Sequence, residues 1–207
     1  MSSLLTPFLE SGKNMKMKLL LFPLSLLFLL ACNTAMIQSP TEQVFGFDFS
    51  EQVPQIPTGD RSAPTHLFVH KYPFYLDGNI TGLTFLNDSD GGSETFILLV
   101  LRPTGDGWKV VHRVEIEGDD QPSAKTGVTT IHFENPLSVQ KGDIFGHWQF
   151  DETGAIPLND ENLSVEGLSF GKFGIGANET AEGQFIQNQG FSGGRDYFIN
   201  IIFQTLP

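Results

Sequence analysis

The alternation of apolar and polar positions predicts a chain built from β-strands. From Thr65 onward, short apolar runs alternate with turn sequences such as Asp77-Gly78, and no window shows a helical 3.6-residue stripe. Many short strands in one chain of this length are typical of a sandwich or a barrel. We predict about ten strands, at residues 65–71, 79–86, 94–101, 108–117, 127–134, 143–150, 163–170, 172–175, 183–187 and 196–204.

The parity of side chains assigns faces to individual strands. Residues 94–101 are apolar at both parities, so we expect a central strand that is covered on both sides. In strand 108–117 the even positions are mainly apolar and the odd positions mainly charged, which predicts one core face and one solvent face. Trp108 lies in the apolar row, and Trp148 shares its parity with Ile144 and Phe150. Both tryptophans are therefore predicted core residues rather than a platform for sugars.

Composition and charge exclude several classes of function. Only 17% of the 207 residues are charged, and 24 acidic against 12 basic residues give a formal charge of −12. Nucleic acid would be repelled, and no phosphate-binding or dinucleotide-binding loop is present, so we expect neither nucleic acid nor nucleotide as a partner. A single cysteine excludes an intramolecular disulfide and a zinc cluster of several thiolates.

The N-terminal region has the order of a secretory signal. Lys16 and Lys18 precede the apolar run 19–30, which is followed by Ala31 and Cys32. At about 1.5 Å per residue such a run covers roughly 18 Å, less than the roughly 30 Å hydrocarbon core of a bilayer. We predict a signal peptide over residues 1–31, in which residues 1–14 are an N-terminal extension if translation starts at Met15 or Met17.

The tetrad Leu29-Leu30-Ala31-Cys32 resembles the lipobox of bacterial lipoproteins. The resemblance implies cleavage before Cys32, acylation of that cysteine and anchoring in a membrane of the cell envelope. Asn33 stands where an inner-membrane retention signal would have Asp, so by resemblance to enterobacterial sorting we expect the outer membrane. The alternative is an incidental cysteine behind an ordinary signal peptide.

The mature chain is predicted to have a tether and one domain. Residues 32–43 would be the lipidated cysteine and a tether, and residues 44–207 the β-sandwich domain. Phe45, Phe47 and Phe49 alternate with polar or small residues, which predicts an edge strand near the start of the domain.

Four segments of the domain resemble secreted bacterial jelly-roll sandwiches. The resemblance implies an antiparallel jelly-roll-like β-sandwich that serves as a carbohydrate-binding or accessory module. Because the sequence shows no assembled catalytic set, we expect binding without catalysis. The segments are Ile80–Phe85, Trp108, Val139–Gly146 and Tyr197–Phe203.

The parity argument also selects candidate binding residues. An exposed aromatic and polar platform is expected on the face of strand 143–150 opposite Trp148, and a second one around Pro73. We expect binding of a glycan or another envelope component; the alternative is a structural or assembly lipoprotein with a protein partner. The residues of the first platform are Phe145, His147 and Gln149, and those of the second are Tyr72, Phe74 and Tyr75, of which the tyrosines are the main candidates.

Alternating carboxylates support a less favoured enzyme hypothesis. Glu115 and Glu117 resemble the paired acids of jelly-roll glucanases and would act as the catalytic carboxylates of a glycoside hydrolase. Two positions of that signature differ here, and Arg113 and Lys109 share the row, so a charge-balanced solvated face explains the acids without catalysis. We therefore expect no enzyme.

One polar loop is a candidate calcium site. Asn87, Asp88, Asp90 and Glu94 supply the hard oxygen ligands that Ca²⁺ prefers. The spacing does not fit an EF-hand, and a polar hairpin turn is the alternative. Apart from this possible calcium ion, we expect no cofactor.

Overall fold

The computed structural model describes residues 41–49, 62–87, 95–116, 127–152, 156–159, 168–193 and 196–206. These residues form an all-β domain whose sheets are antiparallel, as predicted. The described part contains one helix with complete bounds, the 3₁₀ turn η3, and none there is long and apolar enough to cross a membrane. The elements are β1 (Glu42–Gly46), β2 (Leu67–His70), β3 (Gly78–Asn87), β4 (Phe96–Thr104), β5 (Gly107–Ile116), β6 (Gly127–Val139), β7 (Ile144–Trp148), β8 (Leu158–Asn159), β9 (Leu168–Lys172), η3 (Ala177–Thr180), β10 (Phe185–Gln187), β11 (Ser192–Gly193), β12 (Asp196–Tyr197) and β13 (Ile199–Thr205).

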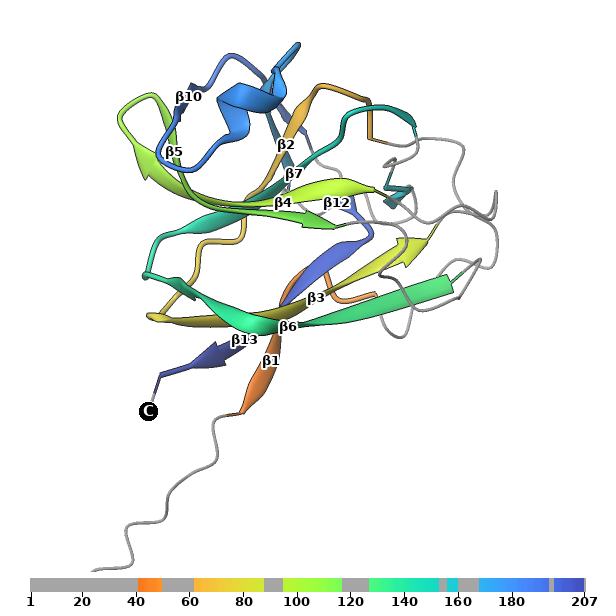
Figure 1. Cartoon of the computed structure of the whole chain (residues 1–207), viewed down its shortest axis with the longest axis vertical. Helices are drawn as coiled ribbons and strands as arrows, with labels where there is room; N and C mark the ends of the chain where they lie inside the picture. The colour runs from red at the N-terminus through yellow and green to blue at the C-terminus, as the bar shows by residue number, and fades with distance from the viewer. Residues whose placement is uncertain are drawn as a thin grey trace, which may run out of the picture. The chain divides into compact units, whose positions relative to one another are not determined.

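The strand order is that of a jelly roll. One layer has the order β1-β13-β3-β6, and the central strands of the other have the order β2-β7-β4-β5. From β1 to β7 the chain crosses between the layers after every strand except β4, which is followed by its neighbour β5. This is the pattern of two Greek keys, with the first and last long strands side by side. Figure 1 shows these two layers, with β1, β13, β3 and β6 in the lower one. The predicted jelly-roll-like sandwich is confirmed.

A long insertion between β7 and β13 enlarges the second layer. It contributes β9 and β11 beside β2, and β10 beside β5, so that this sheet has seven strands. The sheet curls until it is nearly closed, and the backbone N–H of Gln189, just after β10, donates to the carbonyl of Gly171 in β9 at 2.9 Å. As a result, the insertion covers the outer face of the jelly roll's second layer.

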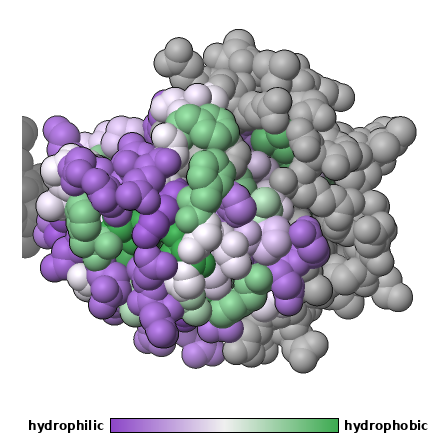
Figure 2. Space-filling model, turned by 90° about the horizontal axis from the view of Figure 1, so that it is seen from above, coloured by the Kyte–Doolittle hydropathy of each residue, from purple (hydrophilic) through white to green (hydrophobic). Residues whose placement is uncertain are grey.

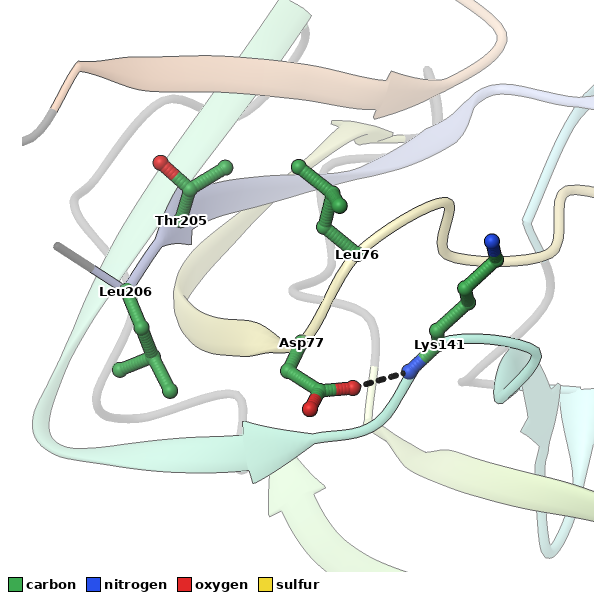
Figure 3. A pocket seen from close by; sticks show the side chains of 5 residues that line it. All are labelled: Leu76, Asp77, Lys141, Thr205 and Leu206. Carbon is green, nitrogen blue, oxygen red and sulfur yellow. Dashed lines mark hydrogen bonds between the residues drawn. The ribbon is translucent and has the colours of Figure 1, made fainter.

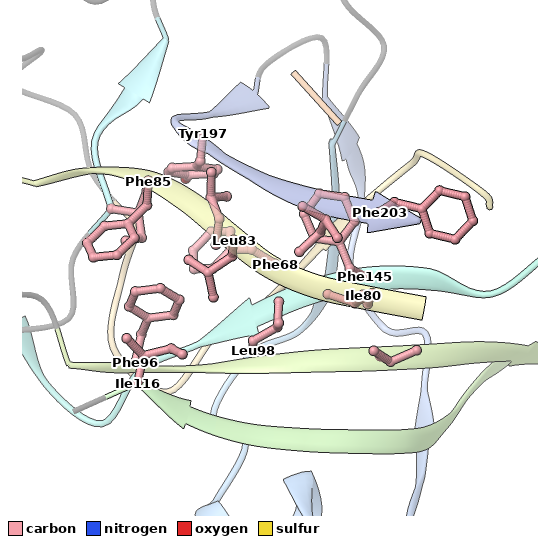
Figure 4. Close-up of a cluster of buried hydrophobic side chains, with 14 of the residues drawn as sticks. Phe68, Ile80, Leu83, Phe85, Phe96, Leu98, Ile116, Phe145, Tyr197 and Phe203 are labelled. Atoms are coloured by element: carbon pink, nitrogen blue, oxygen red, sulfur yellow. The ribbon is translucent and has the colours of Figure 1, made fainter. Parts of the chain in front are cut away.

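The main hydrophobic core lies between the two layers. Figure 4 shows side chains of β3, such as Leu83 and Phe85, directed toward those of β4, such as Phe96 and Leu98. Phe85 and Phe96 meet edge to face with ring centroids 5.2 Å apart. Strand β4 is buried from Phe96 to Leu101 on both faces, which confirms the prediction of a central two-faced strand.

A second core fills the inside of the curled seven-stranded sheet. Trp108 and Trp148 both belong to it, and the indole N–H of Trp148 donates to the carbonyl of Ile175 in the insertion at 3.1 Å. Ile186 of β10 closes the same cluster. Both tryptophans are core residues, as predicted, but they face the insertion and not the opposing layer.

The single face predicted for strand 108–117 is wrong because β5 contains a bulge. Its pairing with β4 shifts between Val100 and Leu101, which are opposite His112 and Val110. Trp108 and Val110 therefore point into the second core, whereas Ile116 points into the first. An extra residue in a strand reverses the parity of every side chain beyond it.

The predicted edge strand starts earlier than expected. β1 covers Glu42–Gly46 and pairs only with β13 in its sheet, so its first two residues lie before the predicted domain start at residue 44. Gly46 has a φ of +111°, which a glycine adopts without strain, and the strand ends there. Phe47 and Phe49 then pack with Phe198 in a third small cluster.

Candidate functional site

The predicted platform on strand 143–150 is wrong, because all three of its residues are buried. β7 lies inside the seven-stranded sheet, with the main core on one face and the second core on the other. Phe145 and His147 point into the main core, and the amide of Gln149 donates to the backbone carbonyls of Ser62 and Asp151. The parity argument assumed that the face of Phe145 and His147 meets solvent, but that face lies against the main core, and the insertion covers the opposite face, which carries Trp148.

The predicted platform around Pro73 is not formed, because Phe74 is buried in the main core and the two tyrosines lie in different surroundings. Tyr72 is half-buried, and its hydroxyl donates to the carboxylate of Asp196 at 2.6 Å. Tyr75 is exposed, and its hydroxyl donates to the side-chain oxygen of Gln43 in β1. They do not form one platform.

A buried polar network connects β2, β7 and β12. Nδ1 of His70 lies 3.0 Å from Oδ1 of Asp196, and Nε2 of His70 lies 3.0 Å from Nδ1 of His147. Asp196 also accepts from the backbone N–H of Tyr197 at 2.9 Å and from the hydroxyl of Tyr72. His70, His147 and Asp196 are all almost fully buried.

The carboxylate fixes the direction of one hydrogen bond in the network. Because a carboxylate only accepts, Nδ1 of His70 donates to Asp196. Nε2 of His147 has no hydrogen-bond partner among the described residues. Burial, together with the neighbouring His70, holds the pKa of His147 well below its usual value, so this imidazole is neutral.

The same network raises the pKa of Tyr72. Burial is the largest cause, and the charge of Asp196 and the hydrogen bond to it act in the same direction. The phenol is therefore a permanent donor to the carboxylate. The imidazoles and the carboxylate lie inside the core, where they join β12 of the insertion to β2 and β7.

Sequence reasoning missed this network because its members lie far apart in the chain. His70 and Asp196 are separated by 126 positions. A signal was present, however: Asp196 opens a strongly apolar segment, and His70 ends another. A lone polar residue at the end of an apolar strand needs a buried partner.

The exposed aromatic side chains of the insertion form a separate candidate site. Phe173 and Phe191 are 46% and 56% exposed, and their ring centroids lie 6.0 Å apart with 36° between the planes. His66 meets Phe173 edge to face at 4.8 Å, and its Nδ1 donates to the carbonyl of Pro64 at 2.7 Å. We call His66, Phe173 and Phe191 the aromatic surface.

Local backbone geometry presents the aromatic surface outward. Phe173 directly follows β9, and Gly174 beside it has a φ of +64°, so the chain turns sharply there. Phe191 directly precedes β11, which pairs with β9. Both rings therefore stand at the end of the same pair of short strands.

Polar side chains lie on the segment that leads to Phe191 of the aromatic surface. The amide of Gln189 donates to the side-chain oxygen of Gln187 at 3.2 Å, and Gln187 donates to Asp106 at 2.9 Å. All three are exposed. Figure 2, which looks from above onto the region of β10 and η3, shows hydrophobic side chains exposed between hydrophilic ones. Apolar rings beside amides and carboxylates are a surface chemistry that suits sugars.

The remaining predictions fall partly outside the described residues. Glu115 is exposed, and Arg113 lies 3.4 Å from it in an ion pair, whereas Glu117 lies outside the described part. Lys109 does not share the row of Arg113, because the bulge at Val111 separates them.

The calcium loop and the lipobox also lie largely beyond the described residues. Asn87 is the last residue of β3, and Asp88, Asp90 and Glu94 follow outside the described ranges. Cys32 and the signal peptide are likewise not described. Within the described ranges, no three His, Cys, Asp or Glu side chains come together in a way that could hold a metal ion.

No family model, no curated protein and no solved structure matches this chain.

Proposed function

We propose that this chain is a lipid-anchored protein of the bacterial cell envelope whose jelly-roll domain binds a glycan without catalysis. The observation that carries the binding proposal is the pair of exposed rings, Phe173 and Phe191, beside His66. Exposed aromatic groups that cluster on a rigid sheet are a common sign of an interaction surface. The insertion covers the outer face of the seven-stranded sheet, so a ligand cannot bind on that face. The aromatic surface, which the insertion itself carries, is exposed instead.

The geometry of the aromatic surface supports a sugar as the ligand. The apolar C–H faces of a sugar ring pack well on phenyl rings, and two tilted rings 6.0 Å apart present a slightly bent surface to such a chain. Gln187, Gln189 and Asp106 offer donors and acceptors for hydroxyl groups nearby. We propose that the ligand is an uncharged polysaccharide, since the formal charge of −12 disfavours polyanions.

A panel of polysaccharides tests the binding proposal. The domain, expressed as residues 33–207, would be run through native gels containing individual soluble glucans, mannans, galactans and xylans, and mixed with insoluble cellulose, chitin and peptidoglycan. We expect retardation or co-sedimentation with at least one of them. If the domain moves freely in every gel and stays in every supernatant, glycan binding is refuted.

The anchor needs its own experiment. The lipobox resemblance implies that the mature chain begins at acylated Cys32, and we propose the outer membrane as its location. Intact-mass measurement of the membrane-extracted protein should give the mass of residues 32–207 plus the acyl groups. Cys32→Ala should leave a protein that lacks these groups and is released from the membrane fraction. An unmodified mass for the parent chain would contradict the anchor.

A protein partner is the alternative, and an exposed sheet edge favours it. Among the described strands β6 pairs only with β3, so within that part of the chain one side of this long strand has no neighbouring strand, and Val128 is exposed on it. Pro136 interrupts part of the edge. Crosslinking in cells through a photoreactive residue at Val128 should give one stoichiometric adduct if this alternative holds.

A further inference from the structure

The entry and the exit of the jelly roll lie at the same end of the domain. β1 starts at Glu42 opposite Gln204, and Thr205 at the end of β13 pairs with Gly78 at the start of β3. In Figure 1, β1 and the C-terminal end lie on the lower side, whereas β10 and the turn η3 lie on the upper side. We call the region around Tyr75, Leu76 and Leu206 the tether end.

The tether end carries exposed apolar side chains around a shallow pocket. Tyr75, Leu76 and Leu206 are 44%, 48% and 55% exposed. The pocket has a volume of about 390 Å³, and Figure 3 shows its lining. The residues are Leu76, Asp77, Lys141, Thr205 and Leu206.

The charged residues of the tether end do not form a basic patch, and Glu42 at the start of β1 adds an exposed acid there. The carboxylate of Asp77 accepts from the backbone N–H of Lys141 at 2.7 Å, and one acidic and one basic residue line the pocket. The domain is acidic overall, so electrostatic attraction would not draw it to anionic lipid. Contact with a membrane at this end would therefore depend on apolar burial.

We propose that the tether end rests against the lipid bilayer to which the chain is tethered, with Leu76 and Leu206 in the interface. This inference rests on the proposed anchor at Cys32. Only residues 33–41 separate Cys32 from β1, and nine residues span at most roughly 30 Å. The anchored end is thus the end that carries these apolar side chains, and leucine and tyrosine side chains are favoured at a bilayer interface.

The opposite end of the same sheet supplies a matched control. Val128 is apolar and 39% exposed, and it pairs with Leu86 near the far end of β3, whereas Gly78 at the near end pairs with Thr205. At about 3.3 Å per residue, the length of β3 separates the two sites by roughly 30 Å. A probe at Val128 should therefore remain in water when a probe at Leu206 does not.

Spin labels in the lipidated full chain test the proposal. Leu206→Cys and Val128→Cys would each be labelled in protein reconstituted into vesicles of phosphatidylethanolamine and phosphatidylglycerol, where the acylated Cys32 has no free thiol. The label at position 206 should show a several-fold lower accessibility to a water-soluble nickel relaxant than the label at position 128, and a higher accessibility to oxygen. Adding Leu76→Asp should raise the nickel accessibility at position 206.

The outcomes separate this inference from the proposed function. The two labels could instead show the same nickel accessibility and the same oxygen accessibility as each other, in protein whose mass shows acylation. That result would overturn the bilayer contact and leave the anchor intact. A mass without acyl groups would overturn the anchor and the contact together. Glycan binding, which is measured on residues 33–207 without lipid, is not affected by either result.

Discussion

The phenol of Tyr72 donates a 2.6 Å hydrogen bond to Asp196, which lies 124 positions further along the chain. The same carboxylate accepts from Nδ1 of His70 and from the backbone of Tyr197. One buried acid thereby joins the chain just after β2 to the end of the insertion. This connection helps to hold the insertion, which is not one of the jelly-roll strands, against the rest of the domain.

Removing the Tyr72 hydroxyl should destabilise the fold. Tyr72→Phe takes one of three donors from a buried carboxylate, and such a loss costs about 1–3 kcal/mol in the free energy of unfolding. The matched control is Tyr75→Phe, which removes a hydroxyl from an exposed hydrogen bond to Gln43 and should change stability by less than about 0.5 kcal/mol. Urea unfolding followed by tryptophan fluorescence measures both. Equal effects of the two substitutions would contradict the role of the network.

The network should also make stability depend on pH. The pKa of His147 is held well below 6.5 in the folded state, while the unfolded imidazole takes up a proton near pH 6.5. Below that pH the unfolded state binds more protons, so the stabilisation is complete above pH 6.5 and is lost as the pH falls, by up to about 1.4 kcal/mol per pH unit. Its charged or titratable neighbours in the network are His70, Asp196 and Tyr72.

Substitution of His147 tests this pH dependence. His147→Gln keeps a side chain that can hydrogen-bond to His70 but cannot be protonated, so the decline in stability from pH 6.5 to pH 5 should become shallower. His132 is exposed on β6, and His132→Gln serves as the control that keeps the parent profile. Urea midpoints across that pH range give the profiles. A parent-like decline in His147→Gln would show that another group is responsible.

Packing of the insertion against the second core should contribute to the free energy of unfolding. Ile186 is buried against the cluster of Trp108 and Trp148, and Ile186→Ala should cost roughly 2–4 kcal/mol. Its neighbour Phe185 is 51% exposed, so Phe185→Ala should cost less than about 1 kcal/mol although it removes a larger side chain. Thermal or urea unfolding compares them. A larger loss for Phe185→Ala would mean that the insertion is not packed as described.

Much of the fold follows from local sequence patterns. Turn sequences mark the ends of most strands, and the two-faced apolar pattern at 94–101 correctly indicates a central strand, β4. The faces of β5 and β7 could not be predicted by parity. A bulge at Val111 reverses the parity within β5, and an insertion from a later part of the chain covers the face of β7 that carries Trp148. Both effects depend on pairing between distant segments.

The candidate site was less predictable than the fold. Phe145 and His147 were expected at the surface because they lie opposite Trp148, yet both faces of β7 are buried. Phe173 and Phe191 lie in short irregular segments beside glycines, where periodicity gives no information about exposure. Their proximity depends on the pairing of β9 with β11, which are joined through the long chain from 173 to 191.

Glycan retention by paired variants tests whether the aromatic surface is the glycan-binding site. With the polysaccharide that retards the parent domain most strongly, the dissociation constant would be measured by affinity electrophoresis for the double variant Phe173→Ala/Phe191→Ala and for Phe185→Ala. Loss of two stacking rings should weaken binding at least about tenfold, since each ring contributes on the order of 1 kcal/mol. Phe185→Ala, another exposed phenylalanine of the insertion, should bind as the parent does. Parent-like binding by the double variant, with an unchanged unfolding midpoint, would contradict the assignment of the aromatic surface as the glycan site.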